Sequence, residues 1–295
     1  MKNIILNILF GAILFIASSF ITYVSFFLNT GGLVEGLTKG MGSLSVFVFI
    51  LLIYFIALKY LRKRMGIWAI TLLILIPIIL FIFPKALNSS LKFSLKFIPY
   101  YISIILGFLA GYYLHSKSKK RLLIPILLAL FPLVMLAGVN NLWVHKIEYG
   151  TFSGEVSNGK KISYEMSNKA GEIISDKSLE GKYVLFDFWY RTCRPCWVKF
   201  PKLQQIYDSY SGHPEVAIYA VNRPMDWDKP GQLYSSIEKK DYTFPVLAGN
   251  QEIMDAFEVY VYPTVVLMDK EGTIIFMGEI EDAEEKLEEL LSANS

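Results

Sequence analysis

The chain has 295 residues, of which 54% are hydrophobic, and a formal net charge of +3. This apolar content is too high for one water-soluble domain of that length and indicates membrane-spanning segments. Residues 1–146 carry 14 lysines and arginines and one acidic residue, whereas residues 147–295 carry 15 basic and 25 acidic residues. The resulting charges of +13 and −10 exclude a single uniform globular protein and predict two domains, 1–146 and 147–295.

Five apolar runs occupy the first half, each near the ~17–25 residues that cross a bilayer as a helix. The runs are approximately 4–28, 44–61, 67–83, 97–114 and 122–139. The first run follows Lys2, as in a signal peptide, but its length and the four later runs favour a retained anchor. Gly107 and Gly111 form a G-x-x-x-G pair that predicts close helix packing. We therefore expect five transmembrane helices in contact with membrane lipid.

Basic loops predict how these helices are oriented. Lys59–Arg64 and Lys117–Arg121 are the densest basic loops, and such loops concentrate on the cytoplasmic side. The loops 29–43 and 84–96 then face outward, the N-terminus is cytoplasmic, and everything after the fifth run is extracytoplasmic. No charged residue interrupts the interior of a run, which argues against a transporter.

From Lys182 onward, strand and helix patterns alternate, which predicts a sheet with helices on both faces. Before it, glycines between residues 147 and 176 punctuate β-type segments and indicate hairpins. The predicted strands are 183–189, 216–221, 244–247, 264–268 and 273–277. The predicted helices are 194–210, 231–240, 251–257 and 282–291. Asp282 with Glu285 resembles a capping box at the start of the last helix.

Both cysteines of the chain lie between the first of these strands and the first helix. The apolar strand Tyr183–Trp189 leads to Cys193, and an amphipathic helical pattern begins at Arg194, so Cys193 would cap that helix. Unpaired backbone N–H groups and the positive end of the helix dipole stabilise a thiolate at this position. Cys196, one turn later, could resolve a mixed disulfide. The spacing predicts a redox-active pair.

Two other interpretations of the C-x-x-C motif are less favoured. A zinc site would need two further ligands, but there is no other cysteine, and His115 and His145 lie beside apolar runs. A purely structural disulfide over this spacing would close too small a loop to stabilise the fold much. No metal and no cofactor is therefore expected, and no nucleotide-binding fingerprint is present.

Two residues far from the cysteines in sequence are further candidates. Asp187 interrupts an apolar strand, where ionisation is costly, so its pKa should rise toward that of a useful general base. The alternative is an acid at the strand end that faces solvent. Pro263 precedes a β-branched strand start, which indicates a strand edge or a cis turn. Arg191 and Arg194 either lower the pKa of Cys193 or are simply solvated.

The segment Asp187-Phe-Trp-Tyr-Arg-Thr-Cys193-Arg-Pro-Cys196, followed by Pro201 and by Tyr262-Pro263-Thr264, resembles the thioredoxin superfamily in order and spacing. The insertion Arg223–Phe257, with its Tyr-Thr-Phe-Pro-Val-Leu sequence, is similar to that of TlpA/ResA-like membrane-anchored thiol-disulfide oxidoreductases. The resemblance covers about residues 150–292 and implies a thioredoxin-like α/β domain after the membrane helices.

The resemblance also implies roles for individual residues. Cys193 would be the attacking thiolate and Cys196 the buried resolving thiol, with Asp187 as the buried acid beside it. Pro263 would be the cis-proline facing the disulfide, and Tyr262 would tune the redox poise and contact substrate.

Thr192 and Arg194 flank the first cysteine and are expected to contact substrate as well. Thr192 stands where many members have tryptophan, and Asp187 where TlpA/ResA-like members often have asparagine. These departures leave the partner and the redox potential open.

The function expected is a membrane-anchored extracytoplasmic thiol-disulfide oxidoreductase that reduces disulfides of partner proteins. The alternatives are a DsbA-like oxidase or isomerase, and a multi-span membrane protein whose thioredoxin domain only docks partners. The expected location is the bacterial inner membrane, with the thioredoxin-like domain in the periplasm. Partners would be disulfide-containing extracytoplasmic proteins, an apocytochrome among the possibilities, and a separate membrane thiol reductase as electron donor. No nucleic acid partner is expected.

Overall fold

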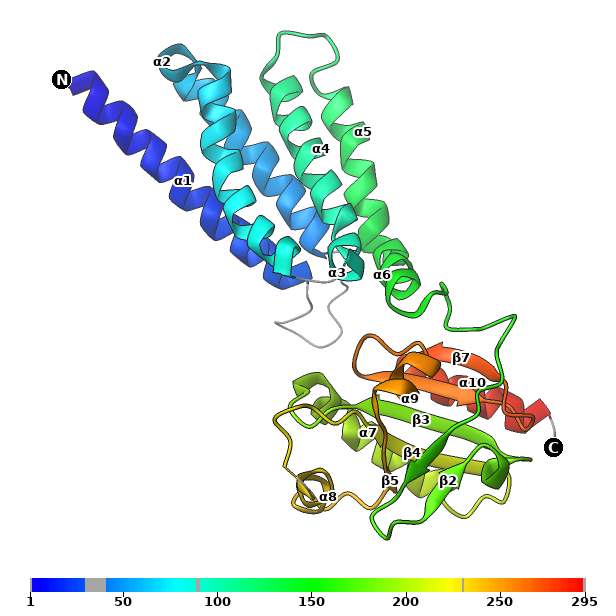
Figure 1. Ribbon diagram of the computed structural model, residues 1–295. Helices are drawn as coiled ribbons and strands as arrows, with labels where there is room; N and C mark the ends of the chain where they lie inside the picture. The colour runs from blue at the N-terminus through cyan, green and yellow to red at the C-terminus, as the bar shows by residue number, and fades with distance from the viewer. Residues whose placement is uncertain (1, 30–40, 89–90, 230, 294–295) are drawn as a thin grey trace. The chain divides into compact units, whose positions relative to one another are not determined.

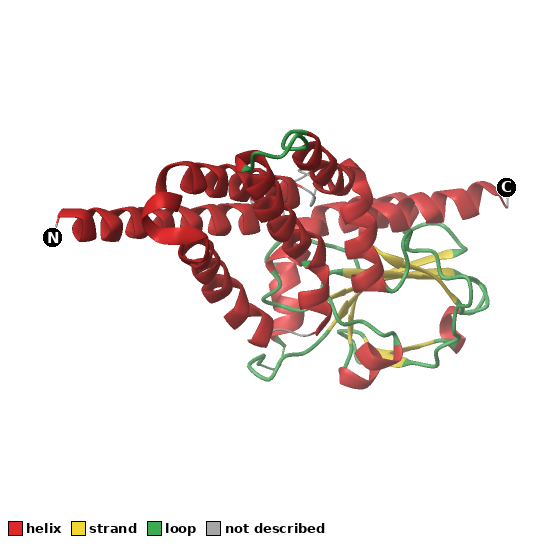
Figure 2. Cartoon of the chain, turned by 90° about the horizontal axis from the view of Figure 1, so that it is seen from above, coloured by secondary structure: helices red, strands yellow, loops and turns green. Residues whose placement is uncertain are grey.

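Two compact units make up the chain in the computed structural model, Met1–Ile147 and Glu148–Ser295. The structure describes residues 2–29, 41–88, 91–229 and 231–293, so most of the predicted outer loop 29–43 lies outside the described residues. Figure 2 shows the first unit as helices joined by loops and the second as strands accompanied by helices. Each unit has its own hydrophobic core, and each is described by itself.

Helices form nearly all of the described part of the first unit. They are α1 (Lys2–Asn29), α2 (Met41–Asn88), α3 (Leu91–Lys96), α4 (Ile98–His115), α5 (Leu123–Val134), the π-helical turn η1 (Met135–Val139) and α6 (Asn140–Tyr149). Gly66 has φ 72° and ψ 160°, a backbone conformation that interrupts α2 and that glycine adopts without steric cost. Figure 1 shows the two limbs of α2 running back along each other.

Three helical stretches are long and apolar enough to cross a membrane, among the residues that the structure describes. They are Met41–Leu80, Ile98–His115 and Leu123–Tyr149, while α1 contains a shorter apolar stretch, Leu6–Phe20. The predicted count of five spans is therefore not confirmed. The predicted runs 44–61 and 67–83 lie on the two limbs of α2, on either side of Gly66, whose backbone angles are not helical.

Gly107 and Gly111 lie on α4 where it meets the first limb of α2. A Cβ atom on Gly107 would come within 2.9 Å of both the Ile50 Cβ and the Phe47 carbonyl oxygen. A Cβ atom on Gly111 would come within 2.9 Å of the Leu51 carbonyl oxygen. The G-x-x-x-G pair thus allows two helices of the same chain to approach closely.

A seven-stranded sheet forms the centre of the second unit, with the strand order β2-β1-β5-β4-β3-β6-β7 in the described residues. The strands are β1 (Glu165–Ser167), β2 (Ile173–Ser175), β3 (Tyr183–Trp189), β4 (Val216–Asn222), β5 (Val246–Ala248), β6 (Thr264–Met268) and β7 (Ile274–Gly278). β3 pairs in parallel with β4 and antiparallel with β6, so the strand that leads to the cysteines is central.

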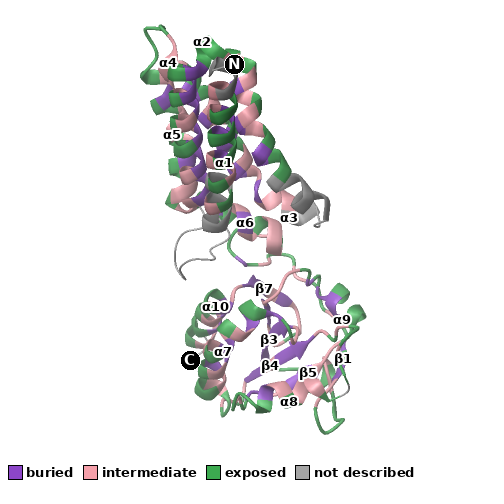
Figure 3. Cartoon of the chain, turned by 90° about the vertical axis from the view of Figure 1, so that its left-hand side faces the viewer, coloured by how far each residue is buried: buried purple, intermediate pink, exposed green. Residues whose placement is uncertain are grey.

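Helices cover both faces of the sheet, as the alternating pattern predicted. They are the 3-10 turn η2 (Lys177–Leu179), α7 (Arg194–Tyr210), α8 (Gln232–Glu238), α9 (Gln251–Ala256) and α10 (Ile280–Ala293). α7, α8 and α10 pack on the face that includes Leu185 and Trp189 of β3, whereas η2 and α9 pack with Phe186 and Phe188. Figure 3 shows buried inner strands and exposed outer sides on α7 and α10. Because side chains alternate along a strand, Asp187 belongs to the face covered by α7.

The predicted boundaries in this unit agree with the structure to within about two residues, with β3, α7 and β6 matching at both ends. The last helix begins at Ile280 rather than Asp282, so the capping-box prediction was wrong. Glu281 and Asp282 instead lie inside the first turn, where carboxylates interact favourably with the positive end of the helix dipole.

Candidate redox-active site

The two cysteines lie at the start of α7, directly after the loop that leaves β3. Cys193 is the N-cap residue, and its Sγ accepts a hydrogen bond from the Cys196 backbone N–H at 3.2 Å. The two sulfurs form a disulfide. Pro195 lies in the first turn, where its missing N–H leaves no helical hydrogen bond unmade. The free N–H groups of this turn and the helix dipole favour a thiolate on Cys193 once the disulfide is reduced.

Aromatic side chains belong to the same core cluster as this disulfide. Cys193 is only 1% exposed, and Cys196 is fully buried. Trp189 packs edge-to-face against Trp197 and Phe200, with ring centroids 5.5 and 5.0 Å apart. The disulfide form of the pair is therefore shielded from bulk solvent.

Asp187 is a buried carboxyl on the same face of the sheet as the disulfide. It is fully buried, and neither carboxyl oxygen has a hydrogen-bond partner in the described residues. Burial, and to a smaller extent the negative charge of Glu281, raise the pKa of Asp187 to about 8, while the positive charge of Lys199 opposes the increase. The alternative of a solvent-facing acid is wrong. A carboxyl with this pKa can take up and release a proton near neutral pH.

Lys199 and Glu281 are the charged groups that act on this carboxyl, and the sequence interpretation did not single them out. Lys199 Nζ lies 2.5 Å from Glu281 Oε1 and 4.0 Å from a carboxyl oxygen of Glu279. The sequence contains no local signal for this group, because only the packing of α10 beside α7 brings the residues together.

The Tyr262–Pro263 peptide bond is cis, directly before β6. Because β6 is antiparallel to β3, its first residue, Thr264, pairs with Phe188 near the end of β3 that leads to the cysteines. The Tyr262 ring packs edge-to-face on Tyr190, with centroids 5.3 Å apart. This contact joins the cis-proline turn to the loop that carries Cys193.

Two of the predicted substrate-contact residues, Thr192 and Arg194, are exposed beside the first cysteine. Arg191 behaves differently, because its Nε lies 2.6 Å from Asp228 Oδ1 in a partly buried ion pair. The sequence left two roles open for Arg191, either to lower the pKa of Cys193 or to be solvated. It did not predict the ion pair with Asp228. The two partners are 37 positions apart in the sequence, and no periodic signal links them.

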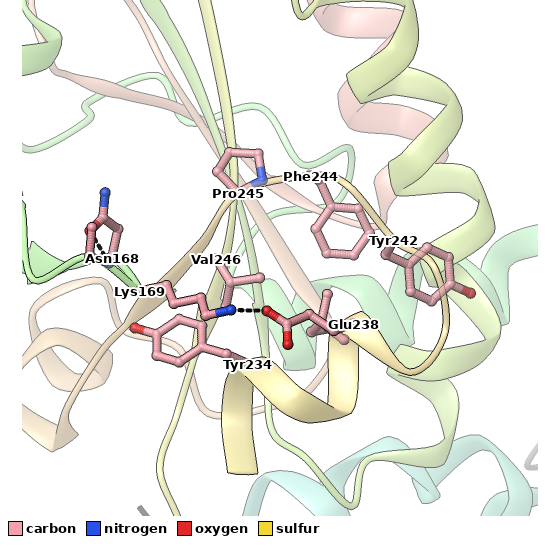
Figure 4. A pocket seen from close by; sticks show the side chains of 10 residues that line it. Asn168, Lys169, Tyr234, Glu238, Tyr242, Phe244, Pro245 and Val246 are labelled. Atoms are coloured by element: carbon pink, nitrogen blue, oxygen red, sulfur yellow. Dashed lines mark hydrogen bonds and ion pairs between the residues drawn. The ribbon is translucent and has the colours of Figure 1, made fainter. Parts of the chain in front are cut away.

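A cavity of about 300 Å³ lies apart from the disulfide, between α8, β5 and the turn that joins β1 to β2. Figure 4 shows its aromatic side chains, Tyr234, Tyr242 and Phe244, and the ion pair between Lys169 and Glu238. Neither cysteine lines it. The cavity is therefore not the place where thiol chemistry occurs.

The arrangement at α7 suits two-electron thiol chemistry. It holds a capped cysteine, a buried second cysteine one turn later, and a buried carboxyl able to exchange protons near neutral pH. Within the described ranges, no group of three or more histidine, cysteine or acidic side chains is placed to hold a metal ion.

The second unit matches the family model described as the AhpC/TSA family over residues 159–277. The thioredoxin-like protein YneN of Bacillus subtilis is 28% identical over 161 residues, which cover 53% of this chain and 93% of YneN. The thiol-disulfide oxidoreductase ResA of Bacillus cereus is 30% identical over 179 residues, which cover 59% of this chain and 96% of ResA. The crystal structure of StoA from Bacillus subtilis is 24% identical, covers 43% of this chain and 98% of StoA, and has a TM-score of 0.38.

The family model falls within the half of the chain that holds the disulfide. The central sheet with helices on both faces in that half agrees with the expected thioredoxin-like α/β fold. Because the ResA match extends over nearly the whole of that protein at 30% identity, the chain belongs to the ResA-like family of thiol-disulfide oxidoreductases.

Proposed function

We propose that this chain is a membrane-anchored, extracytoplasmic enzyme that reduces disulfide bonds of partner proteins. The observation that carries the proposal is the Cys193–Cys196 disulfide at the start of α7, which shares one face of the sheet with the buried, unpaired Asp187. In this proposal residues 1–146 form a five-helix anchor and residues 147–295 the redox domain.

The reaction begins with the reduced pair. The Cys193 thiolate attacks one sulfur of a partner disulfide, a mixed disulfide forms, and the partner's other sulfur leaves as a thiolate. The free amides of the first turn of α7 stabilise the attacking thiolate without any added cation. In this proposal the cis-Pro263 turn, which the Tyr262–Tyr190 contact joins to the cysteine loop, supports an extended stretch of the partner.

The second step releases the partner. The Cys196 thiol gives its proton to the Asp187 carboxylate and attacks the Cys193 sulfur of the mixed disulfide. The Cys193–Cys196 disulfide forms, the partner leaves with both of its thiols, and two electrons have passed to it. Asp187 suits this transfer because its carboxyl oxygens have no competing hydrogen bonds in the described structure.

Return of the enzyme to its dithiol form requires an outside electron source. The chain has two cysteines in total, both in the C-x-x-C pair, so its own membrane helices cannot relay electrons through thiols. We therefore assign re-reduction to a separate membrane thiol reductase. The substrates are disulfide-containing extracytoplasmic proteins, with an apocytochrome as one candidate, and no cofactor takes part.

A redox titration tests the direction of the reaction. We expect the Cys193–Cys196 couple to have a potential near the roughly −270 mV of a thioredoxin-type reductant. The full chain in detergent is equilibrated with dithiothreitol or glutathione buffers, and the thiols are counted after alkylation. A value near the roughly −120 mV of a strong oxidase would overturn the reductive direction in favour of the DsbA-like alternative.

Labelling of intact cells tests the proposed orientation. In a background with both native cysteines changed to serine, Lys117→Cys and Lys177→Cys each introduce one thiol at an exposed position. A membrane-impermeant maleimide is expected to label the Lys177→Cys protein in intact cells, and the Lys117→Cys protein only after the cells are lysed. The opposite pattern would place the redox domain in the cytoplasm, because five spans put the two ends on opposite sides.

A further inference from the structure

The connection between β4 and α8 is a surface segment that the chemistry described above does not use. Figure 1 shows it in yellow, where the chain leaves β4. Its residues 223–229 start beside the redox pair, because β3 and β4 are parallel and both end at this edge of the sheet. The Arg223 backbone N–H donates to the Trp189 carbonyl oxygen at 2.7 Å. This hydrogen bond fastens the start of the segment to Trp189, which is four residues before Cys193 in the sequence.

Asp228 holds the segment against the loop that carries Cys193. Its Oδ1 lies 2.6 Å from Nε of Arg191, and its Oδ2 accepts a hydrogen bond from the Met225 backbone N–H at 3.0 Å. The Arg191 carbonyl oxygen in turn accepts from Trp197 Nε1–H at 2.8 Å. One carboxylate thus closes the segment into a turn and fastens it to the redox loop.

The same segment also reaches the cis-proline turn. The Arg223 guanidinium lies over the Tyr262 ring, 5.9 Å from its centroid. Tyr262 in turn packs on Tyr190 of the redox loop. The three loops that meet at this edge of the sheet are therefore joined by direct contacts.

Trp227 is presented to solvent from this fastened segment. It is 57% exposed, and Pro224 of the same segment is exposed as well. A large apolar side chain on a turn that is held rigidly in place is the arrangement found in binding surfaces, because little conformational entropy is lost when a partner docks. Tryptophan is also enriched among the residues that contribute most to binding.

We propose that segment 223–229, through the exposed Trp227, binds the substrate polypeptide next to the cysteine that Cys193 attacks. The occupant follows from the chemistry: a partner sulfur can bond to Cys193 only if the chain flanking it lies over the neighbouring loops. The substrate class is a disulfide polypeptide with an apolar or aromatic residue beside its reactive cysteine. This inference rests on the proposed reductase function and specifies its substrate preference.

Reduction of three disulfides by the full chain in detergent tests the inference. Two are synthetic peptides with one internal disulfide that differ only in having leucine or serine before the first cysteine. The third is 5,5′-dithiobis(2-nitrobenzoic acid), which has no polypeptide to dock. We expect the wild type to prefer the leucine peptide, and Trp227→Ala to lower kcat/KM for that peptide about tenfold. The serine peptide and the small disulfide should react at nearly unchanged rates.

Ile173→Ala is the matched control, because Ile173 is also 57% exposed but lies on β2, an outermost strand of the sheet. It should leave all three rates unchanged, whereas Asp228→Asn, which removes the ion pair to Arg191, should reproduce the selective loss. An intact leucine preference in Trp227→Ala, or an equal loss for all three disulfides, would overturn the docking surface. A wild-type chain that reduces none of them would overturn the proposed function itself.

Discussion

Replacement of Cys193 by serine is expected to lower the rate of disulfide reduction by about a thousandfold or more, because a serine hydroxyl does not ionise near neutral pH. The capping position favours a thiolate through free amides and the helix dipole, but these groups cannot make an alkoxide available. The measurement is reduction of 5,5′-dithiobis(2-nitrobenzoic acid) and of a disulfide peptide by the full chain. Equal activity of Cys193→Ser and wild type would refute the assignment of the nucleophile.

Cys196→Ser is the matched variant for the other sulfur. It keeps the attacking thiolate but removes the resolving thiol, so a covalent mixed disulfide with the peptide should accumulate. Non-reducing electrophoresis and mass spectrometry detect it, and the double variant lacking both cysteines should show none. If the two single variants trapped partner to the same extent, the roles of the cysteines would have to be reassigned.

Asp187→Asn is expected to slow the reaction of the disulfide form with a thiol about a hundredfold at pH 6, where Asp187 is protonated. Attack on Cys193 expels Cys196 as a thiolate, and the Asp187 carboxyl, with its pKa raised to about 8 by burial, supplies the proton. Rates with dithiothreitol, divided by the thiolate concentration, should fall in the wild type as pH rises through about 8. The variant should show a low rate without this inflection. A wild-type inflection that persists in Asp187→Asn would assign it to another group.

The same substitution should change how stability depends on pH. Burial raises the pKa of Asp187 from 3.8 to about 8, so the folded state binds the proton more tightly than the unfolded state. The contribution of Asp187 to the free energy of unfolding is fully present below the pKa that this residue has in the unfolded chain. It is lost as the pH rises toward the pKa of Asp187 in the folded protein. Between pH 5 and 7, one proton of difference lowers the free energy of unfolding by about 1.4 kcal/mol per pH unit.

In Asp187→Asn this slope should be absent, so the variant should be more stable than the wild type at pH 9. The total difference over the titration is on the order of 5 kcal/mol by linkage. Denaturant unfolding of the disulfide form of residues 148–295 at several pH values measures it. Parallel pH profiles for the two proteins would show that Asp187 does not have the raised pKa.

Local sequence patterns were sufficient for the elements that build the site. The uninterrupted apolar run 183–189 and the helical pattern from Arg194 predicted β3 and α7 with their correct ends, because a buried strand and an amphipathic helix have different hydrophobic periods. The distribution of hydrophobic and charged residues also separated the apolar half of the chain from the half with the redox pair. It placed the runs 44–61 and 67–83 on the two limbs of α2, on either side of Gly66, but apolar length alone did not settle the number of membrane spans.

The sequence by itself determined that two thiols one helical turn apart stand at a helix N-terminus, because both the spacing and the capping position are local properties. It also identified Asp187 as unusual, because a carboxyl in an apolar strand stands out without any structure. Only the tertiary structure decided which charges act on Asp187 and which loop lies beside Cys193. Lys199 meets Glu281, and Arg191 meets Asp228, through the packing of elements far apart in the chain. Such pairings depend on how the sheet and its helices assemble, and no local pattern records them.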